Sequence, residues 1–190
     1  IAAIRGYQLI LTMPENMSLE RRQLLSALGA KIVLTEASGG MAASIRKAEE
    51  LLSENPGAFM PMQFENPANA ESHKTTAEEI WRDTEGKIDA FVAAVGTGGT
   101  LSGTGKYLRM KNEKIEIIAV EPDESAVLSG EKAGSHGIQG IGAGFIPKIL
   151  DTSLISEVIR IKTEDAKKMT ARLAKEEGIL CGISSGAAVL

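Results

Sequence analysis

AFVAAVGTGGTLSG, residues 90–103, is the most informative segment of the chain. A continuous apolar run comes first, a cluster of glycines follows, and a helical pattern then continues to Lys111. This order is typical of a buried parallel strand, a tight turn and the beginning of a helix. We therefore expect a strand, turn and helix unit here.

The glycine turn, defined as residues 96–100, suits a phosphate group. Glycine allows positive φ and close approach of an anion to the backbone, and the first amides of a helix carry partial positive charge. Two threonine hydroxyls add donors. The residues predicted to bind the phosphate, without help from lysine or arginine, are Gly96, Thr97, Gly98, Gly99 and Thr100. The alternative is a turn that is glycine-rich only so that strand and helix pack closely.

Two common phosphate-binding patterns do not match this turn. The dinucleotide-binding fingerprint requires a third glycine at the position of Leu101. A Walker A loop ending at Gly105 and Lys106 would require a glycine at Thr100 and a hydroxyl residue at Tyr107. A different kind of phosphate site is therefore expected.

Composition excludes several classes of protein. The 190 residues are 43% hydrophobic and 24% charged, a composition typical of globular proteins. With 25 acidic and 21 basic residues the net charge is −4, which does not favour nucleic acid as a partner. No apolar run approaches the roughly 18 residues of a membrane-spanning helix. The single cysteine, Cys181, allows no internal disulfide, and this favours a cytoplasmic protein. The chain has only two histidines, His73 and His136, so no metal site is expected. Both histidines are expected to be loop or surface residues.

Strand-like and helix-like segments alternate along the chain, so we expect an α/β fold with parallel sheets and flanking helices. Predicted strands cover residues 7–12, 31–35, 90–94, 115–120 and 156–161. Predicted helices cover residues 18–28, 40–54, 74–83, 99–111 and 163–177. Ser18 and Thr163 are expected to cap their helices, and Leu24, Leu25 and Leu28 to face a core. Proline and asparagine interrupt the periodicity over residues 63–69, which indicates a boundary between a domain at 1–65 and another at 66–190.

Two further segments attract attention. Periodicity is lost for about 25 residues after Pro122, and such a long loop is either functional or a crossing between sheet edges. Residues 182–186, GISSG, match the nucleophile elbow of serine hydrolases, but both histidines precede this motif, whereas the elbow's partners follow it. Instead, the serine pair could cap a helix, or bind a ligand at the sheet edge where the glycine turn opens, if residues 179–181 form a strand.

Six motifs together resemble cysteine synthase (O-acetylserine sulfhydrylase), a family of fold-type II pyridoxal phosphate enzymes with three-layer α/β domains. In chain order they are AAIRGY at 2–7, MPENMS at 13–18, QFENPAN at 63–69, GTGGT at 96–100, QGIGAGF at 139–145 and GISSGA at 182–187. The resemblance implies that the glycine turn holds the phosphate of pyridoxal 5'-phosphate and that Ser184 bonds its pyridine nitrogen. Gln63 and Gly140 would line the substrate pocket. The implied enzyme is a homodimeric transferase that replaces the acetyl group of O-acetylserine with sulfide to give cysteine.

The chain departs from this family at its beginning. The lysine that holds the cofactor, and a loop that binds the substrate carboxylate, precede the position of Ile1, so no catalytic residue is expected within residues 1–190. Met62 stands where the family commonly has a second glutamine, and one residue is missing near His73. We expect a central and C-terminal fragment, inactive alone, that comprises part of the smaller domain and most of the larger cofactor-binding domain. A cystathionine β-synthase-like relative and a truncated, non-catalytic module for phosphate binding or dimerisation remain alternatives.

Overall fold

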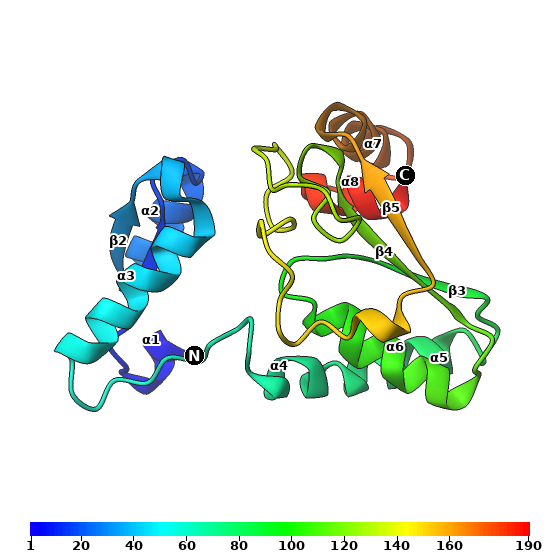
Figure 1. The fold of residues 1–190 in the computed structure, drawn as a ribbon, viewed down its shortest axis with the longest axis horizontal. Helices are drawn as coiled ribbons and strands as arrows, with labels where there is room; N and C mark the ends of the chain where they lie inside the picture. The colour runs from blue at the N-terminus through cyan, green and yellow to red at the C-terminus, as the bar shows by residue number, and fades with distance from the viewer. The chain divides into compact units, whose positions relative to one another are not determined.

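Residues 1–190, all described by a computed structural model, fold as two units, Ile1–Pro61 and Met62–Leu190 (Figure 1). Strands alternate with helices in both units, and every pair of neighbouring strands is parallel. The predicted α/β class with parallel sheets is therefore confirmed.

The first unit contains a two-stranded sheet formed by β1 (Ile10–Pro14) and β2 (Lys31–Thr35). Its helices are α1 (Ala2–Arg5), α2 (Leu19–Ala27) and α3 (Gly40–Glu54), with a 3₁₀ turn at Ala37–Gly39. The strand expected at residues 7–12 begins later, because the ladder starts where the Lys31 N–H donates to Leu9 O at 2.9 Å.

Helix α2 lies where the sequence predicts a helix, but its predicted buried face is mostly exposed. Ser18 caps the helix as expected, since its Oγ accepts a hydrogen bond from the Arg21 N–H at 3.3 Å. Leu24 and Leu28 were predicted to face a core, yet they are 62% and 59% exposed because no element of the chain covers that side of the helix. Only the expectation for Leu25, which is half-buried, agrees with the structure.

The second unit is built on a three-stranded parallel sheet in the order β3-β4-β5. The strands are β3 (Ala90–Ala94), β4 (Glu116–Pro122) and β5 (Glu157–Ile161). The helices are α4 (Pro67–Ser72), α5 (Lys74–Asp83), α6 (Gly99–Lys111), α7 (Thr163–Glu176) and α8 (Ile183–Val189). Short 3₁₀ turns at Asp123–Ser125 and Thr152–Leu154 lie in the connection between β4 and β5.

Helices cover both faces of this sheet and complete three layers (Figure 1). On one face, Leu101 and Leu108 of α6 and Ala77 of α5 pack against strand residues that include Ile117 and Ala119. On the other face, Ala166 of α7 and Ala187 of α8 pack with Val120 and Ile161. Successive strand residues thus point into different cores, as the alternation of side chains along a strand requires.

Three local predictions in this unit were wrong. Proline and asparagine near residue 66 do not interrupt structure but begin helix α4, because Asn66 Oδ1 caps the Ala68 N–H at 3.0 Å and Pro67 occupies the first helical position. Thr163 does not cap α7. It is the first residue of the helix, and its Oγ1 accepts a hydrogen bond from the Gly137 N–H at 3.0 Å. Residues 179–181 form no strand, and Leu180 is 94% exposed.

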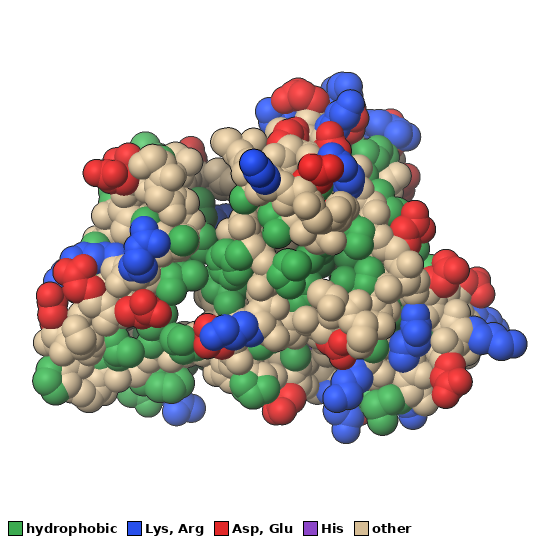
Figure 2. All heavy atoms as spheres, in the orientation of Figure 1, with side chains coloured by type: hydrophobic (Ala, Val, Ile, Leu, Met, Phe, Trp, Pro, Cys, Tyr) green, Lys and Arg blue, Asp and Glu red, His purple; other side chains and the backbone are tan.

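Charged side chains of both signs cover the outer side of α7 (Figure 2). Ion pairs join Lys167 to Glu164, Lys168 to Asp165, and Arg172 to Glu176. The opposite side carries the buried Ala166, so the charge run marks the solvated face of an amphipathic helix. Among the helices of residues 1–190, none has both the length and the apolar character needed to cross a bilayer.

Candidate functional site

The glycine turn joins the carboxyl end of β3 to the beginning of α6. Val95 extends the ladder beyond β3, because its N–H donates to Val120 O at 2.9 Å. Gly98 then takes φ 86°, a left-handed conformation that favours glycine, and serves as the N-cap residue of α6. The sharp reversal places the first turn of a 13-residue helix directly at the edge of the sheet.

The amides of this turn form a cluster of hydrogen-bond donors without acceptors. The backbone N–H groups of Thr97, Gly98, Thr100 and Leu101 donate to no atom of residues 1–190. Gly98 and Leu101 are nevertheless buried. Because unpaired amides at a buried helix start are costly, and because the helix dipole makes this end positive, the cluster suits an anion such as a phosphate.

The two threonine hydroxyls of the turn have partners on neighbouring helices. Thr97 Oγ1 accepts hydrogen bonds from the Gly99 N–H at 3.3 Å and from Asn69 Nδ2 of α4 at 3.0 Å. Thr100 Oγ1 lies 3.2 Å from His73 Nε2. His73, expected to be only a loop or surface residue, therefore contacts the predicted phosphate site.

Gly140 lies directly beside Gly96. It belongs to the glycine loop, defined as residues 140–144, which the Gly142 N–H attaches to the sheet by donating to Val95 O at 3.0 Å. A Cβ atom added to Gly96 would lie 2.5 Å from Gly140 O, so only glycine fits at residue 96 without a shift of the loop. The long segment after Pro122 thus returns to the carboxyl end of β3.

His136 fixes the glycine loop from within the same segment. Its Nε2 lies 2.9 Å from Gly142 O, and its Nδ1 accepts a hydrogen bond from the Ile138 N–H at 3.3 Å. A carbonyl oxygen can only accept, so Nε2 is the donor in the contact with Gly142 O. His136 thus stabilises the conformation of the glycine loop, a role that the sequence did not indicate.

Ser184 completes the cluster from α8. A Cβ atom added to Gly140 would lie 3.9 Å from Ser184 Oγ, so the serine hydroxyl lies close to the glycine loop. The hydroxyl is half-buried and forms no hydrogen bond within residues 1–190. Although no strand precedes GISSG, the packing of α8 against α7 and β3 brings Ser184 to the expected edge of the sheet.

Gln63 is linked to the glycine turn through its backbone. Gln63 O accepts a hydrogen bond from Asn69 Nδ2 at 2.8 Å, and the same amide nitrogen donates to Thr97 Oγ1. The Gln63 side chain is exposed and hydrogen-bonds to no other residue of the chain. All eight residues predicted to bind cofactor or substrate therefore lie at one edge of the sheet. Asn69, which was not predicted to be a site residue, connects two parts of the site.

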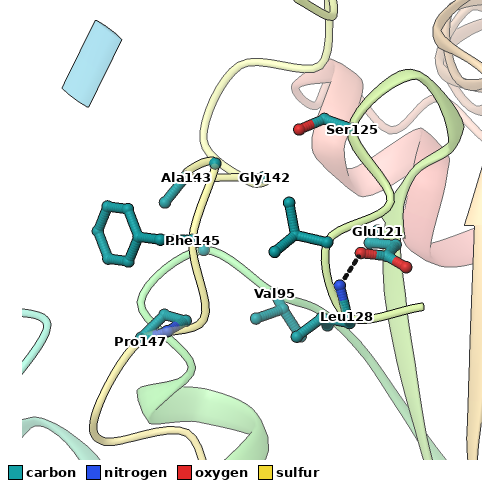
Figure 3. A pocket seen from close by; sticks show the side chains of 11 residues that line it. Val95, Glu121, Ser125, Leu128, Gly142, Ala143, Phe145 and Pro147 are labelled. Atoms are coloured by element: carbon teal, nitrogen blue, oxygen red, sulfur yellow. Dashed lines mark hydrogen bonds between the residues drawn. The ribbon is translucent and has the colours of Figure 1, made fainter. Parts of the chain in front are cut away.

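A small pocket of about 10 Å³ is lined by Val95 and Gly96, by residues of β4 and the following loop, and by residues within 142–147 (Figure 3). The buried carboxylate of Glu121 borders it and accepts hydrogen bonds from the N–H groups of Leu128 and Ser129 at 2.7 and 2.9 Å and from the Ser129 hydroxyl at 2.6 Å. These hydrogen bonds hold the loop after β4 beside the pocket.

Glu124 holds the same loop segment against α7. Burial alone would raise the pKa of this carboxyl group, but hydrogen bonds from Thr163, with a smaller contribution from nearby His136, lower the pKa below its usual value. The Thr163 N–H donates to Glu124 Oε1 at 2.9 Å. Thr163 thus connects the start of α7 both to Glu124 and to Gly137.

The hydrolase alternative finds no support at Ser184. A serine nucleophile needs a histidine within hydrogen-bonding distance. His136 is engaged by Gly142 and Ile138, His73 by Thr76 and Thr100, and neither contacts Ser184. Among residues 1–190 no group of three or more potential metal ligands gathers either.

Fold and site together define an α/β protein with a cluster of unpaired amides at the carboxyl edge of a parallel sheet, where proteins of this class bind ligands. Residues 1–190 match the family model described as pyridoxal-phosphate dependent enzyme. The chain therefore belongs to the pyridoxal-phosphate dependent enzyme family.

Individual relatives agree with this assignment. The chain is 56% identical over 199 aligned positions to cysteine synthase A of Escherichia coli, with all of this chain and 62% of the relative covered. The crystal structure of cysteine synthase from Entamoeba histolytica superposes with a TM-score of 0.92 at 50% identity, covering 99% of this chain and 56% of the other. An O-acetylserine dependent cystathionine β-synthase from Helicobacter pylori gives a TM-score of 0.95 at 38% identity, covering 99% and 61%. The chain thus spans about three fifths of the length of these proteins.

Proposed function

We propose that this chain is the cofactor-phosphate and substrate-pocket part of a cysteine synthase. The reaction is the pyridoxal phosphate-dependent replacement of the acetyl group of O-acetylserine by sulfide, which gives L-cysteine. The observation that carries the proposal is the cluster of unpaired amides at Thr97, Gly98, Thr100 and Leu101, close to Gly140 and Ser184. The identity to cysteine synthase A supports the choice of reaction.

Each predicted cofactor ligand has a chemical role in this proposal. The turn formed by Gly96, Thr97, Gly98, Gly99 and Thr100 surrounds the cofactor phosphate, which accepts hydrogen bonds from the unpaired amides of the turn and from the Thr97 hydroxyl. Ser184, whose hydroxyl has no partner in the chain, donates a hydrogen bond to the pyridine nitrogen. A neutral hydroxyl leaves that nitrogen unprotonated, unlike a carboxylic acid, which would favour the protonated form. When bound, pyridoxal phosphate supplies an electron sink for the substrate's α-carbon, and an unprotonated ring makes that sink a mild one.

Gln63 and Gly140 bound the amino-acid substrate in this arrangement. The exposed amide of Gln63 can bind a carboxylate, and the glycine loop brings backbone close to the cofactor without a side chain in between. The role of this chain is to bind, orient and shield. The lysine that moves the α-proton belongs to a part of the enzyme outside residues 1–190.

The proposal also places the chain within a larger assembly. Residues 1–65 form part of the smaller domain and residues 66–190 most of the larger domain of a cytoplasmic homodimer. Small molecules, and neither nucleic acid nor membrane, are its substrates and partners. A metal ion has no part in the proposed reaction.

A second candidate is a cystathionine β-synthase-like enzyme, since one of the structural neighbours carries that name. A third is a non-catalytic module that retains the phosphate site. An activity assay of the full-length protein that contains this chain distinguishes the three candidates. The protein is loaded with pyridoxal phosphate and supplied with O-acetylserine or O-phosphoserine as the first substrate and with sulfide or homocysteine as the second.

Chromatographic detection of the products gives the answer. Cysteine from O-acetylserine and sulfide, at a rate well above the other combinations, supports the proposal. A preference for homocysteine supports the second candidate. Cofactor binding without turnover on any pair supports the third candidate and contradicts the proposal.

A further inference from the structure

Asn69 lies in the first turn of α4, and its side-chain amide connects the Gln63 segment to the glycine turn. The amide nitrogen lies 2.8 Å from Gln63 O and 3.0 Å from Thr97 Oγ1. Because a backbone carbonyl can only accept a hydrogen bond, the atom that faces Gln63 O must be the nitrogen and not the oxygen of the amide. Both N–H bonds of Asn69 are then used, one on each partner.

This orientation determines what the Thr97 hydroxyl can do. A hydroxyl has one donor and two acceptor positions. Both acceptor positions of Thr97 Oγ1 are occupied, one by Asn69 Nδ2 and the other by the Gly99 N–H at 3.3 Å. Only the proton remains, and no atom of residues 1–190 accepts it. Thr97 is therefore left as a donor, which is the polarity that an anion requires.

Packing around Asn69 keeps the amide in place. The asparagine oxygen lies against Gly99, where an added Cβ atom would collide with it. Close packing of α4 on α6, with Gly103 against Ala70 O, restricts the backbone that carries Asn69. Gly99 thus has two uses, since its N–H orients Thr97 and its missing side chain makes room for Asn69.

We infer that Asn69 is a positioning residue that makes the Thr97 hydroxyl an obligatory donor to the cofactor phosphate and fixes the Gln63 segment relative to the glycine turn. The inference rests on the proposed function, because it assumes that the anion at the turn is the phosphate of pyridoxal phosphate. Asn69 itself touches neither cofactor nor substrate in this account. Its effect on the phosphate passes through Thr97.

A double-mutant cycle in the full-length protein tests this coupling. Asn69→Leu keeps the size of the side chain but removes both donors, and Thr97→Val keeps the shape but removes the hydroxyl. Each single variant is expected to weaken pyridoxal phosphate binding about tenfold, as for loss of one hydrogen bond to a charged group. The double variant is expected to lose about tenfold as well, and not about a hundredfold, because both changes remove the same interaction.

Affinities are measured by absorbance titration of the apo-protein with pyridoxal phosphate and, separately, with pyridoxal, which lacks the phosphate. Asn69→Leu should lower the affinity for pyridoxal phosphate and leave that for pyridoxal within about twofold, a selectivity that a general loss of structure would not produce. The KM for O-acetylserine should also rise. Ser72→Ala, which removes a 2.8 Å hydrogen bond to Asn69 O on the same helix, is the matched control and should change neither affinity.

The outcomes separate this inference from the proposed function. If Thr97→Val leaves the affinity for pyridoxal phosphate unchanged, the assignment of the phosphate to Thr97 is wrong. If Thr97→Val weakens binding but Asn69→Leu does not, or if the two losses multiply, the coupling through Asn69 is wrong. Should Asn69→Leu fail to fold, Asn69→Ala, which adds no volume, provides the same cycle.

Discussion

Gly140 O lies so close to Gly96 that a Cβ atom on Gly96 would stand 2.5 Å from it. The two glycines come from distant parts of the chain, yet this contact determines the spacing between the glycine turn and the glycine loop. Gly96→Ala should push the loop away from the turn, because a backbone oxygen cannot yield as a flexible side chain can. We expect pyridoxal phosphate affinity in the full-length protein to fall by about tenfold or more, which corresponds to about 1.4 kcal/mol.

Gly130→Ala is the control for this substitution. Alanine at residue 130 would be strained, because Gly130 has a φ of 86°, but its Cβ atom would meet no other atom within 4 Å. The strain should lower the thermal unfolding midpoint without changing cofactor affinity. Equal losses of affinity in both variants would show that the contact between Gly96 and Gly140 has no special role.

The hydroxyl of Ser184 should matter for the cofactor and not for stability. It forms no hydrogen bond within residues 1–190, so Ser184→Ala removes no internal interaction and should shift the unfolding midpoint of the apo-protein by less than about 2 °C. In the cofactor-loaded protein the same change should alter the absorption spectrum of pyridoxal phosphate and lower its affinity. Ser185→Ala, at the exposed neighbouring residue, should do neither. A spectrum unaffected by Ser184→Ala would remove Ser184 from the site.

Glu121 should be among the residues most important for stability. Its carboxylate is 2% exposed and accepts three hydrogen bonds from Leu128 and Ser129. Glu121→Gln turns one of the two acceptor atoms into a donor that faces N–H groups, so we expect a loss of about 2 kcal/mol and a fall of about 5 °C in the unfolding midpoint. Glu116→Gln, at the exposed beginning of the same strand, should have almost no effect. Comparable midpoints for the two variants would contradict this role.

The low pKa of Glu124 predicts a stability that depends on pH. Burial opposes ionisation, but hydrogen bonds from Thr163 and from the backbone of Glu124, together with nearby His136, lower the pKa below the ordinary value of 4.5. Since the folded pKa lies below the unfolded one, the stabilisation is fully present above pH 4.5 and is lost as the pH falls through the folded value. Unfolding midpoints of the wild type and Glu124→Gln should therefore differ at pH 7 and converge toward pH 3. A constant difference across this range would contradict the assignment.

Sequence patterns located most of the fold because its elements follow local rules. The cap at Ser18 and the left-handed conformation of Gly98 each act on their own neighbours in the chain. The predictions failed where a distant partner decides the outcome. Thr163 caps no helix because α7 already begins at this residue, with Lys162 at the N-cap position, and its hydroxyl binds Gly137 instead. Residues 179–181 form no strand because no neighbouring strand pairs with them.

The candidate site shows the same division. The resemblance to a known family predicts that Gly96, Gly140 and Ser184 belong to one site. Their proximity in the structure agrees with a shared role. Asn69 and His136 were not predicted to be site residues, since each acts by orienting another residue. A hydrogen bond between residues that are far apart in the sequence, such as that of Asn69 with the Thr97 hydroxyl 28 residues later, leaves no periodic pattern in the sequence.

The most direct test of the central claim is the amide spectrum of the full-length protein, labelled with ¹⁵N, as pyridoxal phosphate is added. If backbone amides of the glycine turn hold the phosphate, the signals of Thr97, Gly98, Thr100 and Leu101 should show the largest shifts, and pyridoxal without phosphate should leave them almost unchanged. Amide signals at residues 97–101 that stay in place while the cofactor saturates its site would contradict the account.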